Sequence, residues 1–332
     1  MTQRRRSPSS RRRLLAGIAL AACTLVAPLT IAQSFPSKPI RLVIGYPPGG
    51  AVDANARLVA PKLGELLGQP VVVENRPGAS GVIATDYVAK SPPDGYTILL
   101  TTIGHTITPV LSRKPPYEPI NDFVPVTQVT GTSMVLLVNP KVPATTFPEF
   151  VALAKSKPGK LNYGSSGAGD PLGLAMEVLK LQAGLDIVEV PYKGVGPTYT
   201  ALLAGDIEAA FMPPSASIPY IKAGTLRPIA MGGAQRSVAL PDVPTVAESG
   251  YPGFDAVNWQ GLLLPANTPM DIARRYQREI VKVLATPEIR ERLVAGGQDV
   301  IASTPEEFTA RIRADVAKFG RVIRDAKIPL QD

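Results

Sequence analysis

From residue 38 onward, short runs rich in valine, leucine and isoleucine alternate with longer stretches in which apolar residues recur every three or four positions. Residues 41–46 (RLVIGY) have the composition of a buried strand, and residues 52–67 have a helical periodicity that ends at Gly68. The same alternation predicts strands over 71–74 and 96–102, with a helix over 81–89 between them. A strand, helix, strand order is typical of parallel sheets with helices on both faces.

The alternation restarts after Asp122 and predicts a second α/β unit. Strands are expected over 123–129, 134–139, 161–164, 187–191, 209–212 and 226–231, and helices over 147–156, 172–183, 197–204 and 218–223. An extended segment over 255–264 then leads into a helical tail. In that tail the sequences TPMD at Thr268 and TPEE at Thr304 both have the form of a capping box with proline at the first helical position.

Two sheets joined by extended segments near 123–130 and 255–264 predict two lobes with a cleft and a hinge between them. Each lobe is expected to be a mostly parallel sheet flanked by helices. The first domain is expected over 33–125 and 258–332, and the second over 126–257. A chain of 332 residues is long enough to bury two cores of this kind.

The N-terminus has the layout of a secretory signal peptide. Residues 1–32 hold six arginines and no acidic residue, and their apolar run over 14–31 ends just before Ala32 and Gln33. We expect cleavage after Ala32 and release into the periplasm. The alternative is a membrane anchor, which is disfavoured because the run has only 18 residues and contains Pro28.

The export route is left open between the Sec and twin-arginine pathways, because SRRRLL resembles a twin-arginine signal that a Sec signal can mimic. The sequence LAAC around Cys23 resembles a lipoprotein cleavage box, but the residues after it stay apolar through Ile31. We therefore interpret Cys23 as part of the removed segment, so lipoprotein anchoring is the less favoured outcome. The mature chain would then contain no cysteine and no disulfide.

The positive charge of the chain resides mainly in this leader. The whole sequence has a formal net charge of +8, but without the six leader arginines it has 29 basic against 27 acidic residues. A nearly neutral body gives no support to a surface that binds nucleic acid.

Two glycine-rich turns join a strand to a helix and are candidates for anion binding. The first, GYPPGGAVD, spans 45–53, and the second, NYGSSGAGDP, spans 162–171. Glycines let a ligand approach backbone N–H groups at a helix start, where the helix dipole favours an anion. A tight turn also needs glycine for its own geometry, so one such turn alone would not indicate a site. The second turn adds Ser165, Ser166 and Gly167 as candidate ligand-binding residues.

Two further strand ends complete the candidate site, because the carboxyl ends of strands build the crevices of α/β sheets. Thr101 and Thr102 close a predicted strand of the first unit, just before His105. In the second unit, the corresponding residues are Tyr192, Lys193 and Gly194.

Catalytic chemistry is poorly supported. His105 is the only histidine, and no G-x-S-x-G sequence supplies a serine nucleophile. The glycine-rich turns fit neither a phosphate-binding P-loop nor a dinucleotide fingerprint, and the histidine and cysteine counts exclude a metal site built from those residues. We expect no enzyme activity, no cofactor and no metal. His105 is interpreted as a hydrogen-bonding residue of the pocket or, alternatively, as a structural residue.

These residues resemble a known family. The matching blocks are PSKPIRLV, YPPGGAVD, VENRPGASG, PDGYTILL, PGKLNYGSSGAGD, VPYKGVGPTYTALLAGDIEAAF, YIKAGTLRPIAM, LPDVPTVAESGYPGF and WQGLLLPANTP. Together they resemble the substrate-binding proteins of tripartite tricarboxylate transporters, often called the Bug family, over nearly all of residues 36–330. The resemblance implies a two-lobed periplasmic binding protein fold of type II.

The same resemblance implies a function. Its typical ligands are carboxylic acids, which include dicarboxylates, amino acids and aromatic acids. One ligand carboxylate is held on the first glycine-rich turn, which maps here to Tyr46, Pro48, Gly49, Gly50 and Asp53. The expected role is to capture such a ligand, as a monomer, and to pass it to the membrane subunits of a transporter. The alternative is a sensor that contacts a periplasmic signalling receptor when it is loaded.

The second turn departs from the family pattern. Many members read Gly-Ser-x-x-His-Leu where this chain has Gly169, Asp170, Pro171, Leu172, Gly173 and Leu174. Asp170 could serve only as a helix cap, which is a common role for aspartate. If it also faces the cleft, its charge would repel a dicarboxylate and favour an amino acid or a monocarboxylate.

Overall fold

The computed structural model describes residue 2, residues 35–167 and residues 169–332. The predicted signal peptide and its cleavage site therefore lie outside the described residues, apart from Thr2. Residues Lys38–Asp332 form one compact unit that contains two sheets. None of the helices described is long and apolar enough to cross a membrane.

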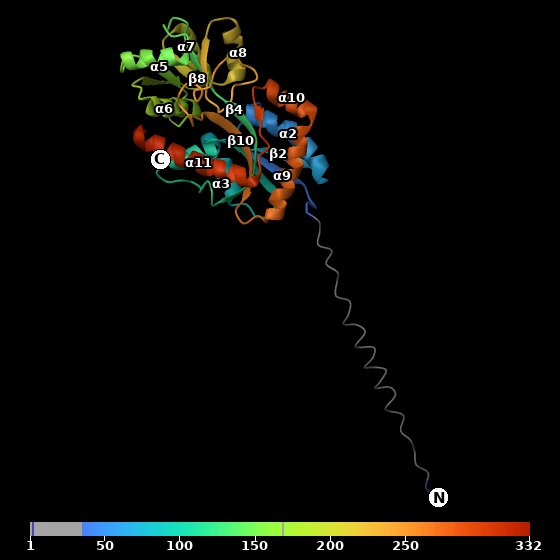
Figure 1. Ribbon diagram of the computed structural model, residues 1–332. Helices are drawn as coiled ribbons and strands as arrows, with labels where there is room; N and C mark the ends of the chain where they lie inside the picture. The colour runs from blue at the N-terminus through green and yellow to red at the C-terminus, as the bar shows by residue number, and fades with distance from the viewer. Residues whose placement is uncertain (1, 3–34, 168) are drawn as a thin grey trace. The chain divides into compact units, whose positions relative to one another are not determined.

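The first sheet has the strand order β11-β4-β10-β3-β1-β2. Its strands are β1 (Ile40–Ile44), β2 (Val71–Asn75), β3 (Thr97–Thr102), β4 (Phe123–Ser133), β10 (Val257–Pro265) and β11 (Asp299–Val300). The associated helices are η1 (Ala79–Gly81), α2 (Ala51–Leu67), α3 (Val82–Ala89), α4 (Gly104–Leu111), α9 (Met270–Ala285), α10 (Pro287–Ala295) and α11 (Pro305–Asp325). We call this sheet and these helices the first lobe; in Figure 1 they are the blue to cyan parts, the green strand β4, and the orange to red parts.

The second sheet has the strand order β7-β6-β8-β5-β9. Its strands are β5 (Val135–Val138), β6 (Asn162–Ser165), β7 (Val188–Pro191), β8 (Ala209–Met212) and β9 (Arg227–Met231). Its helices are α5 (Phe147–Ser156), α6 (Pro171–Ala183), α7 (Val195–Ala204) and α8 (Pro214–Lys222). We call this part the second lobe; it is green to yellow in Figure 1.

The α/β class with two helix-flanked sheets is confirmed, but each sheet is mixed rather than mostly parallel. Parallel pairing is confined to β1 with β2 and β3, and to β6 with β7 and β8. The strands next to the crossings, β4, β5 and β10, pair antiparallel with their neighbours. The reason at the first sheet is that the chain leaves it along β4 and comes back along β10. These two neighbouring strands therefore run in opposite directions.

The two connections between the lobes lie side by side. The chain leaves the first sheet at Ser133 and returns to it at Val257, and these two residues are paired in the β4–β10 ladder. The N–H of Met134 donates to the carbonyl of Ala256 at 3.1 Å, and the N–H of Gly232 donates to the carbonyl of Met134 at 2.7 Å. The predicted extended segments are therefore paired strands of the first lobe, and the crossing itself is only a few residues long.

Close packing at β10 requires glycine at two places. A Cβ on Gly232 would lie 2.8 Å from the Cβ of Ala256 at the crossing. A Cβ on Gly261, in the middle of β10, would collide with the ring of Phe308 on α11. Phe308 in turn packs edge to face on the buried Trp259, whose indole N–H donates to Asp315 at 2.8 Å. This cluster holds α11 against β10.

The two predicted capping boxes have different outcomes. At α11, Thr304 accepts from the N–H of Glu307, and the Glu307 carboxylate accepts from the N–H of Thr304, so that box is confirmed. At α9 the prediction is wrong, because the N-cap is Pro269 and the Thr268 hydroxyl donates to the Pro265 carbonyl instead. The tight turn Pro265–Thr268 uses the hydroxyl that would otherwise cap the helix.

Candidate functional site

A cavity of about 860 Å³ lies between the two lobes. From the first lobe it is lined by the ends of β1 and β3 and by α4, and from the second lobe by the turn between β6 and α6. Two parts of the chain that are distant in sequence also line it. They are Asn258 on β10 and, in the segment that follows α11, Gln331 and Asp332. We call this cavity the cleft.

Four helices begin at the cleft. Val52, Val82, Gly104 and Pro171 line it, and they lie in the first turns of α2, α3, α4 and α6. Each of these helices follows a strand (β1, β2, β3 and β6) whose carboxyl end opens toward the same space. Because the first turn of a helix has unpaired N–H groups and the positive end of the dipole, this arrangement favours a bound anion.

Tyr46 and Thr102 bring two strand ends together inside the cleft. The Tyr46 hydroxyl and Thr102 Oγ1 are 2.7 Å apart. Burial raises the pKa of Tyr46, and its hydrogen bond with Thr102 opposes this only in part, so the phenol stays protonated at neutral pH. Gly45 allows the turn to pack closely here, because a Cβ on it would lie 2.5 Å from the Cα of Gly81. Because one hydroxyl donates to the other, the pair has one O–H left to donate to a ligand oxygen.

The first glycine-rich turn is held from within by Asp53. Its carboxylate accepts from the N–H of Gly49 at 2.9 Å, from Arg57 Nε at 3.0 Å and from Asn75 Nδ2 at 2.9 Å. The hydrogen bond from Arg57 is the largest of the causes that hold the pKa of Asp53 at about 2. Asp53 and the predicted residues Pro48, Gly49 and Gly50 are not among the residues that line the cleft. In this structure Asp53 thus fixes the turn that places Tyr46 and Val52.

The second glycine-rich turn places Ser166 and Asp170 in the cleft wall. Asp170 is the N-cap of α6: its Oδ2 accepts from the N–H of Ser166 at 3.0 Å and from the N–H of Gly173 at 3.2 Å. A Cβ on Gly173 would lie 2.9 Å from the Cβ of Ser165, so a larger side chain there would push α6 away from β6. Asp170 is therefore both a helix cap and a cleft residue, and its neighbour Gly173 is required by packing.

The remaining residues of this turn have other surroundings. Ser165 is fully buried, and its Oγ accepts from the N–H of Gly167 at 3.2 Å. Gly167 lines a second cavity of about 410 Å³, which also borders Asp170 and the segment Lys327–Pro329. Neither Ser165 nor Gly167 lines the cleft.

His105 lies in the core of the first lobe rather than in the cleft. It is 1% exposed, stacks on Tyr117 and meets Phe123 edge to face. Its Nε2 is 2.8 Å from the Pro119 carbonyl, whereas its Nδ1 has no hydrogen-bond partner among the described residues. Burial lowers the pKa of His105 to about 4, so the ring is neutral at pH 7. Of the two interpretations offered by the sequence, this placement fits the structural one.

The other predicted residues also lie outside the cleft lining, which includes none of Thr101, Tyr192, Lys193 and Gly194. Thr101 is buried on β3, next to Thr102 but on the other face of the strand. Tyr192 follows β7 and donates its N–H to the Ser165 carbonyl, which supports the second turn from outside the cleft. Lys193 is exposed.

Several residues that line the cleft were not predicted from the sequence. Ala79 and Ser80 line it from a left-handed turn, with φ of 45° and 54°, that only the glycines of VENRPGASG could have indicated. Ile107, Thr108 and Leu111 line it from α4, a helix that the sequence analysis did not predict.

The end of the chain forms a further wall of the cleft. The N–H of Gln331 donates to the Leu111 carbonyl at 2.8 Å, and the N–H of Arg113 donates to the Gln331 carbonyl at 2.9 Å. No pattern in the sequence connects residues so far apart along the chain.

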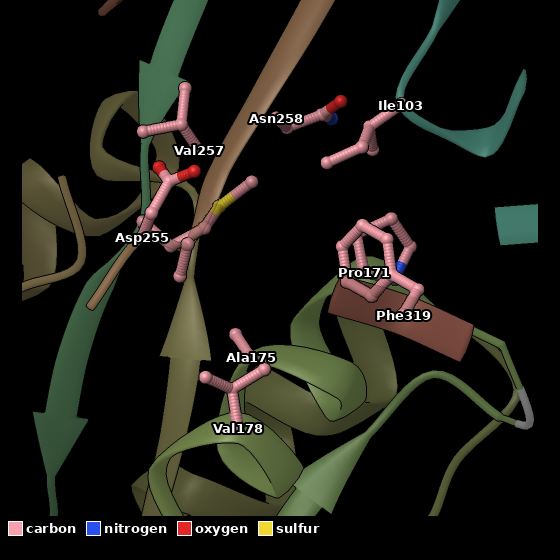
Figure 2. Close-up of a pocket in the computed structure, with 10 residues that line it drawn as sticks. Ile103, Pro171, Ala175, Val178, Asp255, Val257, Asn258 and Phe319 are labelled. Atoms are coloured by element: carbon pink, nitrogen blue, oxygen red, sulfur yellow. The ribbon is translucent and has the colours of Figure 1, made fainter. Parts of the chain in front are cut away.

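A small cavity of about 10 Å³ lies where β10 faces α6. Figure 2 shows Asn258 pointing toward Ile103, with Ala175 and Val178 of α6 on the other side of the space. The Oδ1 atom of Asn258 is buried and has no hydrogen-bond partner among the described residues. Asn258 and Pro171 line both this cavity and the cleft, so the two cavities adjoin at these residues.

Among the described residues, no group of three or more histidine, cysteine, aspartate or glutamate side chains could hold a metal ion. The arrangement brings helix starts and hydroxyl-bearing residues from two lobes around one cavity.

Comparison with known sequences identifies a family to which this chain is similar. Residues 55–328 match the family described as the tripartite tricarboxylate transporter family receptor. Protein BugT of Bordetella pertussis is 36% identical over 323 residues, which cover 96% of this chain and 99% of BugT. The resemblance found in the sequence is thereby confirmed.

Solved structures of similar proteins support the same family assignment. A periplasmic transporter structure is 40% identical, with a TM-score of 0.73, and covers 90% of this chain and 100% of its own. Rpa4515 of R. palustris with adipate is 33% identical, with a TM-score of 0.72, and covers 89% and 99%. MatC of Rhodopseudomonas palustris with bound malate is 29% identical, with a TM-score of 0.69, and covers 87% and 100%. The two named ligands are both dicarboxylates.

Proposed function

From the premise that the chain belongs to the tripartite tricarboxylate transporter receptor family, we propose that it is a periplasmic solute-binding protein. It captures a small carboxylate-bearing organic anion in the cleft and delivers it to the membrane subunits of a transporter. It acts as a monomer and performs no chemistry on the ligand. The signal-peptide layout of residues 1–32 supports export.

The observation that carries this proposal is the cleft itself. Four helix starts and four residues that carry a hydroxyl group, Tyr46, Ser80, Thr102 and Ser166, line one cavity between two lobes. Several hydrogen bonds to a charged ligand group at about 1.5–3 kcal/mol each can supply the roughly 8 kcal/mol of micromolar binding. Relatives with adipate and malate support a carboxylate as the ligand group.

The first test is native mass spectrometry of freshly purified protein for a bound small acid, followed by calorimetric titration with adipate, malate and 6-aminohexanoate. We expect at least one of them to bind with a dissociation constant of about 100 μM or tighter. Failure of all three at millimolar concentration, with no co-purified acid, would argue against the proposal.

A matched pair of variants tests whether the ligand binds in the cleft. Thr102→Val removes a hydroxyl that lines the cleft, whereas Thr101→Val removes a buried hydroxyl on the other face of the same strand. The first should weaken binding by about three- to tenfold, since one hydrogen bond contributes about 0.5–1.5 kcal/mol. The second should change it less than about twofold, and equal losses would mean that the ligand does not contact Thr102.

A further inference from the structure

The charged groups of the cleft are unevenly distributed. Among the described residues that line it, Lys114, Asp170 and Asp332 carry charge. Lys114 and Asp332 lie on the side of the first lobe, and Asp170 belongs to the second lobe. No acidic side chain of the described residues lies within ion-pair distance of Lys114, and Asp332 is 91% exposed and pairs with Arg113 at 3.6 Å. Among the described lining residues, the second lobe therefore contributes a negative charge alone, whereas the first lobe contributes one cation and one solvent-exposed carboxylate.

Asp170 is fixed in this position. Within the described residues, the hydrogen bonds from the N–H groups of Ser166 and Gly173 both end on Oδ2, and Asp170 lines the cleft as well as the neighbouring cavity of about 410 Å³. Pro171 follows it directly, and the N–H of Asp170 donates to the Gly167 carbonyl at 3.1 Å, which restricts the backbone on both sides. Among the described residues, no ion pair joins the Asp170 carboxylate to a Lys, Arg or His side chain; Lys180, which lines the neighbouring cavity with Asp170, pairs with Glu177 at 2.7 Å. Asp53 in the first turn differs, since Arg57 neutralises it.

The geometry points to Asp170 as the residue that selects the ligand class: a carboxylate with a hydrogen-bond-donating far end, such as an ammonium, amide or hydroxyl group, in preference to a dicarboxylate. This inference rests on the proposed function, because it concerns the far end of a ligand whose carboxylate is held by the first lobe. A donor group at that end can pair with the Asp170 carboxylate, whereas a second carboxylate meets a like charge that its two capping hydrogen bonds hold in place.

Three ligands of similar length test this directly: adipate, its monoamide and 6-aminohexanoate. Their far ends are anionic, neutral and cationic. Calorimetric titration of the parent protein should give affinities in the order 6-aminohexanoate, monoamide, adipate. In Asp170→Asn, whose side chain is an equally good helix cap, the ratio of the adipate affinity to the 6-aminohexanoate affinity should rise by at least about fivefold, as removal of one nearby like charge predicts.

Asp332→Asn is the matched control, because it removes the same charge from the solvent-exposed side of the cleft. It should leave that ratio within about twofold, since exposed charges are screened. Thermal unfolding of each variant, within a few degrees of the parent, confirms that the fold is intact.

The outcomes distinguish failure of the inference about Asp170 from failure of the proposed solute-binding function. An unchanged ratio in Asp170→Asn, with both ligands still bound, overturns the inference and leaves the proposed function standing. Equal rises in both variants also overturn it, because they would reflect the field of the whole protein rather than Asp170. If the parent protein binds none of the three ligands and no small acid co-purifies with it, the proposed function is overturned, and the inference with it.

Discussion

At the scale of single residues, the two acidic side chains of the glycine-rich turns have parallel structural roles and different charge environments. Asp53 accepts the N–H of Gly49, and Asp170 accepts the N–H of Ser166, so each carboxylate closes a turn across four residues. Arg57 neutralises Asp53, whose pKa is held at about 2. The sequence indicates both turns, but it could not show which acid lies in the wall of the cleft, because that depends on the position of Arg57 and of the opposite lobe.

His105 makes the stability of the protein depend on pH. Its pKa is about 4 in the folded state because burial disfavours the charged ring, against 6.5 when it is exposed. The folded protein therefore binds fewer protons, and stability is fully present above pH 6.5 and is lost as the pH falls toward 4. We expect the free energy of unfolding to fall by about 2 kcal/mol from this group between pH 8 and about pH 5.

Urea unfolding of the parent and of His105→Gln at a series of pH values measures this contribution. The glutamine amide can still donate toward the Pro119 carbonyl, which His105 contacts at 2.8 Å. The variant should be less stable at pH 8 and should lose less stability on acidification. Parallel pH profiles for the two proteins would contradict the prediction.

At the scale of elements, strands and helices with strong local patterns were predictable, and those fixed by tertiary contacts were not. The helix α5 was predicted to the residue, and β8 likewise, because their apolar spacing and flanking residues are clear. The short helix α4 was missed because its sequence, GHTITPVL, is rich in β-branched residues and contains a proline. It exists because it packs against α11, more than 190 residues later.

The contact between β10 and α11 gives the prediction at this scale. Gly261→Ala would drive a methyl group into the ring of Phe308, and we expect the free energy of unfolding to fall by about 2 kcal/mol or more. Adding Phe308→Leu should recover part of the loss. Gly196→Ala in α7, where nothing lies within 4 Å of the new methyl group, is the control and should change stability by less than about 1 kcal/mol. An equal loss at both positions in urea unfolding would show that contact with Phe308 is not the cause.

At the scale of the whole molecule, the lobes meet across the cleft at Gly169 and Leu111. A Cβ on Gly169 would collide with the Leu111 side chain, whereas a Cβ on Gly167 would meet nothing within 4 Å, and both glycines have a positive φ. We expect Gly169→Ala to hold the lobes apart and to weaken 6-aminohexanoate binding by about tenfold or more, with a larger radius of gyration in small-angle scattering. Gly167→Ala carries similar backbone strain and should retain most of the affinity.

A second substitution distinguishes the contact from strain. Leu111→Ala added to Gly169→Ala removes the colliding side chain and should restore a large part of the binding. If the double variant binds no better than Gly169→Ala, backbone strain at residue 169 would account for the loss instead.

The neighbouring positions of β4 and β10 also determine the order in which the two sheets can form. All five strands of the second sheet lie between residues 135 and 231, so that sheet can form as soon as its own sequence has been made. The first sheet cannot, because β4 needs a partner that begins at Val257, and β10 separates β4 from β3. Pairing over so long a sequence interval is slow. The lobe that contains the first strands of the chain is therefore the one that is completed last.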